Sequence, residues 1–171
     1  INRGAKTIAI GYTELSYDQL VLTTGSWPRR LPSKIGGDLQ GVYVMRDLAD
    51  ADTMAQEFVA GKKVLIIGGG YIGLEAAAVA AAKGLDVTLV EMADRILQRV
   101  AAPQTSDYFR ALHQSHGVKI IEGVGLSTLE GNDDKVSTAT LSDGTELDVD
   151  FVIAGVGVAP ADELARQAGL D

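Results

Sequence analysis

The sequence predicts an α/β fold, in which a Rossmann-like parallel sheet is flanked by helices and carries an inserted three-stranded antiparallel meander. Three observations lead to this prediction. Four β-favouring residues at 64–67 run directly into three glycines. An alanine-rich helical stretch follows and ends at Gly84, and a second apolar run at 87–90 ends at Glu91. Strand, tight turn, helix and strand in this order are typical of a βαβ unit with parallel strands.

The glycines have the spacing of a dinucleotide-binding fingerprint, Gly68-x-Gly70-x-x-Gly73, at the strand-to-helix turn. Gly68 lets the chain turn sharply, Gly70 lets a pyrophosphate approach the backbone, and Gly73 lets the helix pack close to the strand. The helix that begins there directs its free N–H groups towards the phosphates. We therefore expect a dinucleotide at this turn. The alternative is a glycine-rich turn in an unrelated α/β domain.

Glu91 lies eighteen residues after Gly73, at the tip of the second strand. Its carboxylate can accept hydrogen bonds from the adenosine ribose, each worth about 1.5–3 kcal/mol. The same charge would repel a 2′-phosphate, so Glu91 favours NAD(H) over NADP(H). NADP(H) remains the alternative, because Arg95 and Arg99 could bind a 2′-phosphate if the following loop curled back.

The first 60 residues are expected to form short elements. Two prolines bracket residues 27–32, which should therefore form an irregular linker. The other expected elements are a hairpin at 7–10 and 14–16, a more buried strand at 19–23, a short strand at 42–45 and a helix from 47 to about 59.

After Glu91 the chain should complete the sheet. A helix is expected at 103–116, and His113 and His116 should be solvated near its end; no metal site is expected. The remaining elements are a third parallel strand at 118–121, a meander at 126–130, 136–142 and 146–149, a strand at 150–154 that returns to the sheet, and a helix at 160–168.

Composition narrows the functional class. The chain has 171 residues, of which 46% are hydrophobic, enough for a real core. Its 15 basic and 23 acidic residues give a net charge of −8, which argues against nucleic acid or an anionic membrane as partner. There is no cysteine, hence no disulfide or redox dithiol within these residues. No apolar run approaches membrane-spanning length. The chain begins at Ile1 and resembles an excised fragment, so a cytoplasmic location is only a default expectation.

An internal repeat suggests two related domains. Residues 13–25 align with residues 145–157 without a gap, at a constant offset of 132. Thr, Glu, Leu, Asp and Gly are identical, and the apolar runs coincide. Residues 1–40 would then be the tail of an FAD-binding domain with a linker, and residues 41–171 the NAD(H)-binding domain. Alternatively, both segments are generic hairpin-to-strand units.

Three segments resemble a known superfamily in the correct order. Residues 23–29 resemble its "ATGxxPR" segment, residues 68–75 its second-domain fingerprint, and residues 155–160 its "GVxP" segment. Together they resemble the FAD-dependent pyridine nucleotide-disulfide oxidoreductases, and residues 45–51 resemble the NADH-dependent ferredoxin/rubredoxin reductase branch. The resemblance covers nearly the whole chain.

The resemblance implies a flavoprotein in which NADH passes a hydride to FAD, which then reduces a ferredoxin- or rubredoxin-type acceptor. This chain would hold the NAD(H) domain and would be inactive alone. The alternatives are an NADH oxidase, peroxidase or disulfide reductase of the same superfamily, or a non-catalytic nucleotide-binding module. The lack of cysteine argues against the thioredoxin-reductase type.

The resemblance also assigns roles to residues. Tyr71 is expected to cover the flavin until nicotinamide enters, although it could simply cap the helix. Glu75 is expected in the nicotinamide pocket, or else only complements the helix dipole. The other expected contacts are Ile72 with nicotinamide, Arg99 with the adenosine-pyrophosphate end, Gly155, Val156 and Gly157 with NAD(H), and Thr24 and Gly25 with FAD.

Overall fold

The computed structural model describes residues 1–170 and divides into two compact units. The larger unit comprises residues 28–157, and the smaller comprises residues 1–27 together with the C-terminal segment from Val158. The predicted division of the chain at residues 40 and 41 remains a prediction about domains of the whole protein.

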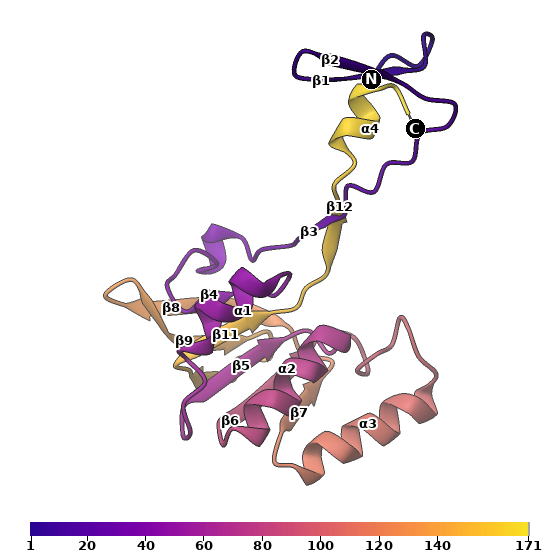
Figure 1. The fold of residues 1–171 in the computed structure, drawn as a ribbon. Helices are drawn as coiled ribbons and strands as arrows, with labels where there is room; N and C mark the ends of the chain where they lie inside the picture. Colours follow the sequence, from indigo (N-terminus) through magenta and orange to yellow (C-terminus); the bar gives the residue numbers. More distant parts are fainter. Residues whose placement is uncertain (171) are drawn as a thin grey trace. The chain divides into compact units, whose positions relative to one another are not determined.

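A five-stranded parallel sheet forms the centre of the larger unit (Figure 1). Its strand order is β4-β11-β5-β6-β7, and every neighbouring pair is parallel. The strands are β4 (Val42–Tyr43), β5 (Lys63–Ile67), β6 (Asp86–Glu91), β7 (Lys119–Glu122) and β11 (Phe151–Ala154). The predicted α/β fold with a parallel sheet is therefore confirmed.

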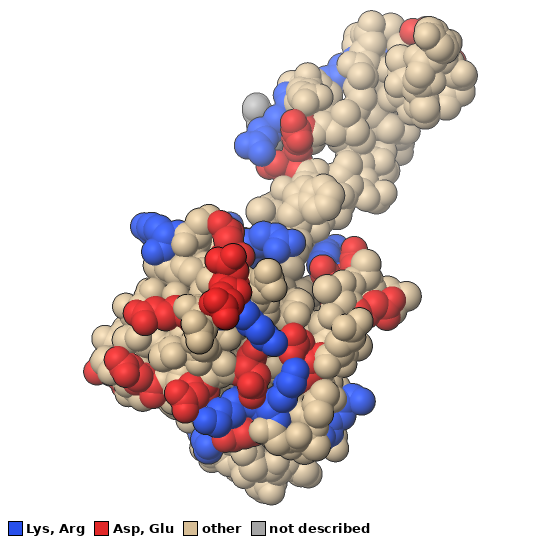
Figure 2. All heavy atoms as spheres, turned by 90° about the vertical axis from the view of Figure 1, so that its left-hand side faces the viewer, with Lys and Arg blue, Asp and Glu red and all other residues tan. Residues whose placement is uncertain are grey.

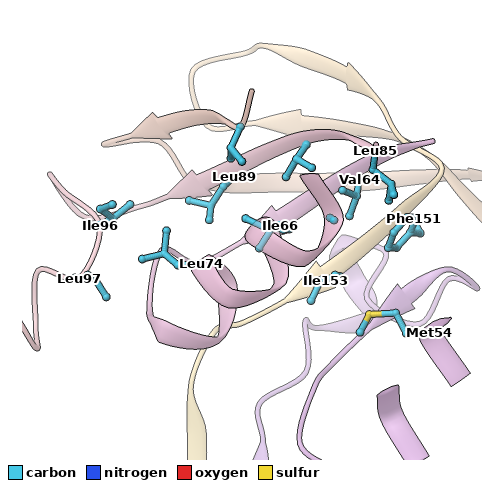
Figure 3. Packing of buried hydrophobic residues seen from close by; sticks show 14 residues of the cluster. Met54, Val64, Ile66, Leu74, Leu85, Leu89, Ile96, Leu97, Phe151 and Ile153 are labelled. Atoms are coloured by element: carbon cyan, nitrogen blue, oxygen red, sulfur yellow. The ribbon is translucent and has the colours of Figure 1, made fainter. Parts of the chain in front are cut away.

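Helices pack on one face of this sheet. They are α1 (Leu48–Ala55), α2 (Tyr71–Ala82) and α3 (Pro103–Ser115). Residues alternate between faces along a strand, so Val64 and Ile66 of β5 join the cluster that contains Leu74 of α2 and Met54 of α1 (Figure 3). Ala77 and Ala80 are fully buried in the same cluster, which explains the alanine-rich sequence of α2.

The antiparallel meander covers the opposite face. Leu65 and Ile67 of β5 pack there with Leu129, Val136 and Leu141 of the meander. Because both faces are covered, β5 is apolar along nearly its whole length. The meander strands are β8 (Leu126–Asn132), β9 (Lys135–Leu141) and β10 (Glu146–Asp148), in the order β10-β9-β8.

The smaller unit contains short elements. The predicted hairpin is present as β1 (Thr7–Ile10) and β2 (Thr13–Ser16). The prediction of a buried strand at 19–23 was wrong, because no strand among the described residues pairs with this segment and Val21 is 79% exposed. The aligned segment of the internal repeat does form strands, β10 and β11.

The linker prediction for residues 27–32 was wrong at its start. Trp27 and Pro28 end the short strand β3 (Ser26–Pro28), which pairs with β12 (Val158–Pro160). Each strand ends on a proline, a position where the missing N–H is tolerated. The expected C-terminal helix is also shorter, because β12 precedes it and α4 spans only Glu163–Gln167. A 3-10 turn, η1 (Ser33–Ile35), follows Pro32.

The charged surface is mixed in sign. On the face drawn in Figure 2, acidic and basic side chains lie interspersed. Ion pairs between elements include Lys63 with Asp148, at 3.1 Å, and Lys119 with Asp86, at 3.0 Å. Within residues 1–170, no helix combines the length and apolar character needed to cross a bilayer.

Candidate nucleotide-binding site

The fingerprint turn lies where the direction of the sheet connections reverses. From β5 the chain passes through α2 to β6 on one side, whereas β11 pairs with β5 on the other. Ala154 of β11 is level with Ile67 of β5, and the Gly155 N–H donates to the Ile67 carbonyl at 2.8 Å. The two carboxyl-end segments predicted to bind the nucleotide therefore meet at the position where open α/β sheets bind ligands.

Two of the fingerprint glycines are required by packing. Gly68 has φ +106°, and a Cβ atom there would lie 2.5 Å from the Gly155 carbonyl oxygen. A Cβ atom at Gly73 would overlap the Gly68 carbonyl oxygen. These contacts join the turn, α2 and the end of β11, so any larger residue would force the backbone apart.

Gly70 differs from both, because neither its conformation nor its neighbours require glycine. Its φ is −81°, and a Cβ atom there would meet nothing within 4 Å. The space above this backbone is open to a ligand. Gly70 is also the N-cap of the twelve-residue helix α2, and no side chain caps that end. The first-turn N–H groups and the positive end of the helix dipole are thus available to a phosphate.

The side chains in the first turns of α2 are exposed beside the Gly70 backbone. Tyr71 is 59% exposed and Ile72 is 41% exposed. Glu75, one turn further on, is also exposed. The helix start therefore offers an aromatic ring, an aliphatic side chain and a carboxylate next to the uncapped N–H groups.

Glu91 ends β6 beside the turn. One carboxylate oxygen accepts the Gly69 N–H at 2.6 Å, and the other accepts the Ala93 N–H at 2.8 Å. Each oxygen retains a further acceptor site for a ribose hydroxyl. The structure therefore places Glu91 next to the fingerprint, as expected, and adds a role that the sequence did not reveal: the side chain shapes the turn itself.

The loop that follows β6, residues 92–101, packs directly on the turn. Ile96 is fully buried, and a Cβ atom at Gly69 would lie 2.6 Å from its Cγ2 atom. The Leu97 N–H donates to the Gly69 carbonyl at 2.9 Å, with Leu97 at φ +55°. Figure 3 shows Ile96 and Leu97 in the same cluster as Leu74 of α2.

A charged pair supports this loop from beneath. Glu122, at the end of β7, accepts the Ile96 N–H at 2.7 Å. Arg110 of α3 donates to both oxygens of Glu122, at 2.8 and 3.0 Å, and to Asp107 at 2.7 Å. These hydrogen bonds raise the pKa of Arg110 above its ordinary value. Neither Glu122 nor Arg110 was recognised in the sequence; only the Asp107 and Arg110 pair had a local signal, a spacing of three on one helix.

The two arginines of the loop have different surroundings. Arg95 donates to the Ser106 hydroxyl at 2.5 Å and to the carbonyls of Ala101 and Gln98 at 2.9 and 3.2 Å. Arg99 is exposed and makes no hydrogen bond or ion pair among the described residues. Of the two, Arg99 is therefore the one whose guanidinium is free for a ligand.

Comparison with protein families matches all 171 residues to the model for pyridine nucleotide-disulphide oxidoreductases. The chain belongs to this family. It is 42% identical over 149 residues to the chloroplastic/mitochondrial monodehydroascorbate reductase of Arabidopsis thaliana, which covers 86% of this chain and 30% of that relative. It is 43% identical over 160 residues to putidaredoxin reductase of Pseudomonas putida, covering 91% and 38% of the two chains.

Among solved structures, the putidaredoxin reductase chain of a covalent complex with putidaredoxin superposes with a TM-score of 0.89 at 40% identity. The match covers this whole chain and 42% of that chain. The predicted resemblance to this superfamily and to its ferredoxin reductases is therefore confirmed. The chain spans only about a third of the length of these relatives.

The remaining predicted contact residues of this pyridine nucleotide-disulphide oxidoreductase domain lie in two places. Val156 packs against the meander side of the core, and Gly157, at φ +94°, accepts the Arg29 N–H at 2.9 Å. Thr24 and Gly25 belong to the smaller unit, where both bond to Ala161. The structure thus brings Gly155 to the fingerprint, whereas the FAD contacts of Thr24 and Gly25 remain predictions.

The prediction that His113 is solvated was wrong. Its side chain is buried between two helices, with Nδ1 2.8 Å from the Phe109 carbonyl oxygen and Nε2 3.0 Å from that of Leu74. The polar ring is tolerated there because the N–H of a neutral imidazole can donate to one or the other of these carbonyls. His116 is exposed, as expected.

Two surface hollows of the family domain lie away from the fingerprint. One, of about 180 Å³, is at the amino ends of the strands and is lined by Lys63, Asp86 and Lys119. The other, of about 330 Å³, lies between α2 and α3 beside Leu112 and His116. Neither hollow includes the uncapped N-terminus of α2 or the glycines of the fingerprint turn.

Proposed function

We propose that this chain is the NAD(H)-binding portion of an FAD-dependent reductase that passes a hydride from NADH to FAD and then electrons to a ferredoxin- or rubredoxin-type acceptor. The observation that carries the proposal is the open backbone at Gly70, on an uncapped helix start, with the Glu91 carboxylate at the neighbouring strand end. Family membership and the similarity to putidaredoxin reductase support it.

The proposed roles follow the geometry of the turn. The diphosphate lies over Gly70, where the first-turn N–H groups of α2 stabilise its charge. Glu91 accepts the hydroxyls of the adenosine ribose, and the exposed Arg99 attracts the adenosine-pyrophosphate end. Gly155, Val156 and Gly157 present backbone to NAD(H) at the end of β11.

The nicotinamide end is assigned to the start of α2. Tyr71, Ile72 and Glu75 are the exposed side chains there, and Tyr71 covers the flavin face until nicotinamide displaces it. Thr24 and Gly25 contact FAD in the whole protein. When bound, FAD supplies the hydride acceptor; the residues of this chain bind and orient the nucleotide.

Glu91 is the residue to test first. Titrating NADH and NADPH into the protein, followed by nucleotide fluorescence, should show tighter binding of NADH, because the carboxylate accepts the ribose hydroxyls and repels a 2′-phosphate. Glu91→Ala should reduce this preference by about tenfold, the equivalent of one hydrogen bond to a charged group. Equal or reversed affinities in the unchanged protein would contradict the assignment.

The control for this experiment must separate binding from folding. Glu91 also accepts two backbone N–H groups, so the variant is expected to lose some stability, which urea unfolding measures. Glu130→Ala removes an exposed glutamate of the meander and should leave both affinities unchanged. A preference that survives intact in Glu91→Ala would show that another group reads the ribose.

A second candidate is a reductase of a small-molecule acceptor, favoured by the 42% identity to monodehydroascorbate reductase. The two candidates share the NAD(H) site and differ only in the electron acceptor. The rate of NADH oxidation by the whole protein should be measured with each electron acceptor in turn: a ferredoxin, monodehydroascorbate radical, a disulfide and oxygen. Fastest turnover with a ferredoxin supports the first candidate, and fastest turnover with the radical supports the second.

A further inference from the structure

The structure assigns a specificity-determining role to Ser106: by holding Arg95 within the 92–101 loop, it keeps a cation away from the ribose end of the nucleotide and so preserves the preference for NADH. This inference rests on the proposed NAD(H) site. It concerns a residue of α3 that has no place in the fingerprint.

Ser106 is fully buried near the start of α3. Its hydroxyl donates to the Ile96 carbonyl at 2.6 Å and accepts from Nη1 of Arg95 at 2.5 Å. One hydroxyl therefore fixes two consecutive residues of the loop. A buried serine that uses both its donor and its acceptor in this way specifies the position of its partners.

The partners of Arg95 carry no negative charge. Besides Ser106, its guanidinium donates to the Gln98 and Ala101 carbonyls, and it forms no ion pair among residues 1–170. Its positive charge is thus held in place but not neutralised. Arg95 lies two residues after Ala93, whose N–H binds Glu91, so release of this side chain would free a cation close to the carboxylate that excludes a 2′-phosphate.

The loop itself has other anchors. Glu122 accepts the Ile96 N–H, and the Leu97 N–H donates to the Gly69 carbonyl. Neither bond involves Ser106, so without the hydroxyl the loop should stay against the fingerprint turn. Arg95 would then keep only its donations to the Gln98 and Ala101 carbonyls and could leave its position more easily. The predicted result is a change in the ratio of the NADH and NADPH affinities, whereas loss of packing alone would weaken the binding of both nucleotides equally.

The test is Ser106→Ala, with NADH and NADPH titrated at two ionic strengths. NADPH should bind more tightly than before, so that the ratio of the two affinities narrows about two- to fivefold, the effect of one exposed ion pair. The gain should shrink at high salt, where screening weakens the new contact. Ser115→Ala is the matched control, because Ser115 is an exposed serine of the same helix. Its hydroxyl donates to the Leu112 carbonyl and lies 3.2 Å from Nδ1 of His116, and it contacts neither Arg95 nor the 92–101 loop.

A double variant identifies the cation. Adding Arg95→Gln to Ser106→Ala should restore the original ratio. An unchanged ratio in Ser106→Ala, or a narrowed ratio that persists after Arg95→Gln, would overturn the inference. If Ser106→Ala does not fold, Ser106→Cys keeps the side-chain volume and is titrated in the same way. Failure of the unchanged protein to bind either nucleotide would instead contradict the proposed function.

Discussion

The fingerprint turn and the 92–101 loop meet at Gly69, and they are shaped in opposite ways. The fingerprint turn, residues 68–73, is shaped by missing side chains: Gly68 and Gly73 leave room for backbone that would otherwise collide. The 92–101 loop is shaped by side chains that reach it from elsewhere, Glu122 from β7 and Ser106 from α3. The comparison shows that one site can combine a turn that the local sequence predicts with a loop whose position depends on tertiary contacts.

Gly73→Ala is the strongest test of whether missing side chains shape the fingerprint turn. The added methyl group would overlap the Gly68 carbonyl, so α2 must move away from β5. We expect a loss of about 3 kcal/mol or more in the free energy of unfolding, at the upper end of overpacking effects. Urea unfolding measures it. A loss below about 1 kcal/mol would show that the turn relaxes easily and that packing does not require this glycine.

Glu122→Gln tests whether side chains from other elements hold the 92–101 loop in place. It weakens the bidentate bond to Arg110 and the bond to the Ile96 N–H, in a place where the Glu122 side chain is 18% exposed. We expect a loss of about 1–2 kcal/mol in the free energy of unfolding. Asp107→Asn is the matched control, because Asp107 binds the same arginine but is 69% exposed, and it should cost no more than about 0.5 kcal/mol. Equal losses in the two variants would mean that Glu122 does not support the loop.

These two segments also explain what the sequence could predict. The βαβ unit could be predicted because apolar runs, glycine spacing and an alanine-rich helix are local patterns, and the position of Glu91 followed from the strand that it ends. The contacts of the 92–101 loop could not be predicted. Ile96 and Glu122 are 26 residues apart, and nothing in the spacing of either indicates that one accepts the other's N–H.

Longer-range pairing was missed for the same reason. The strands β3 and β12 come from opposite ends of the chain, so Pro28 indicated a linker when the partner strand was unknown. His113 was expected to be solvated because its buried partners, the carbonyls of Phe109 and Leu74, cannot be seen in a helical pattern. At residues 19–23, an apolar run predicted burial, but burial needs a neighbouring strand that the described residues do not provide.

The most direct test of the central claim is NADH binding to Gly70→Ala. Gly70 has an ordinary φ of −81° and open space around its Cβ position, so alanine should cost at most about 1 kcal/mol of stability, as a weaker N-cap. Gly4→Ala, at an exposed glycine of the smaller unit with room for a methyl group, is the control. If the diphosphate lies over Gly70, NADH affinity should fall about tenfold or more, with folding retained. Unchanged affinity in Gly70→Ala would contradict the account, because the nucleotide would then bind elsewhere.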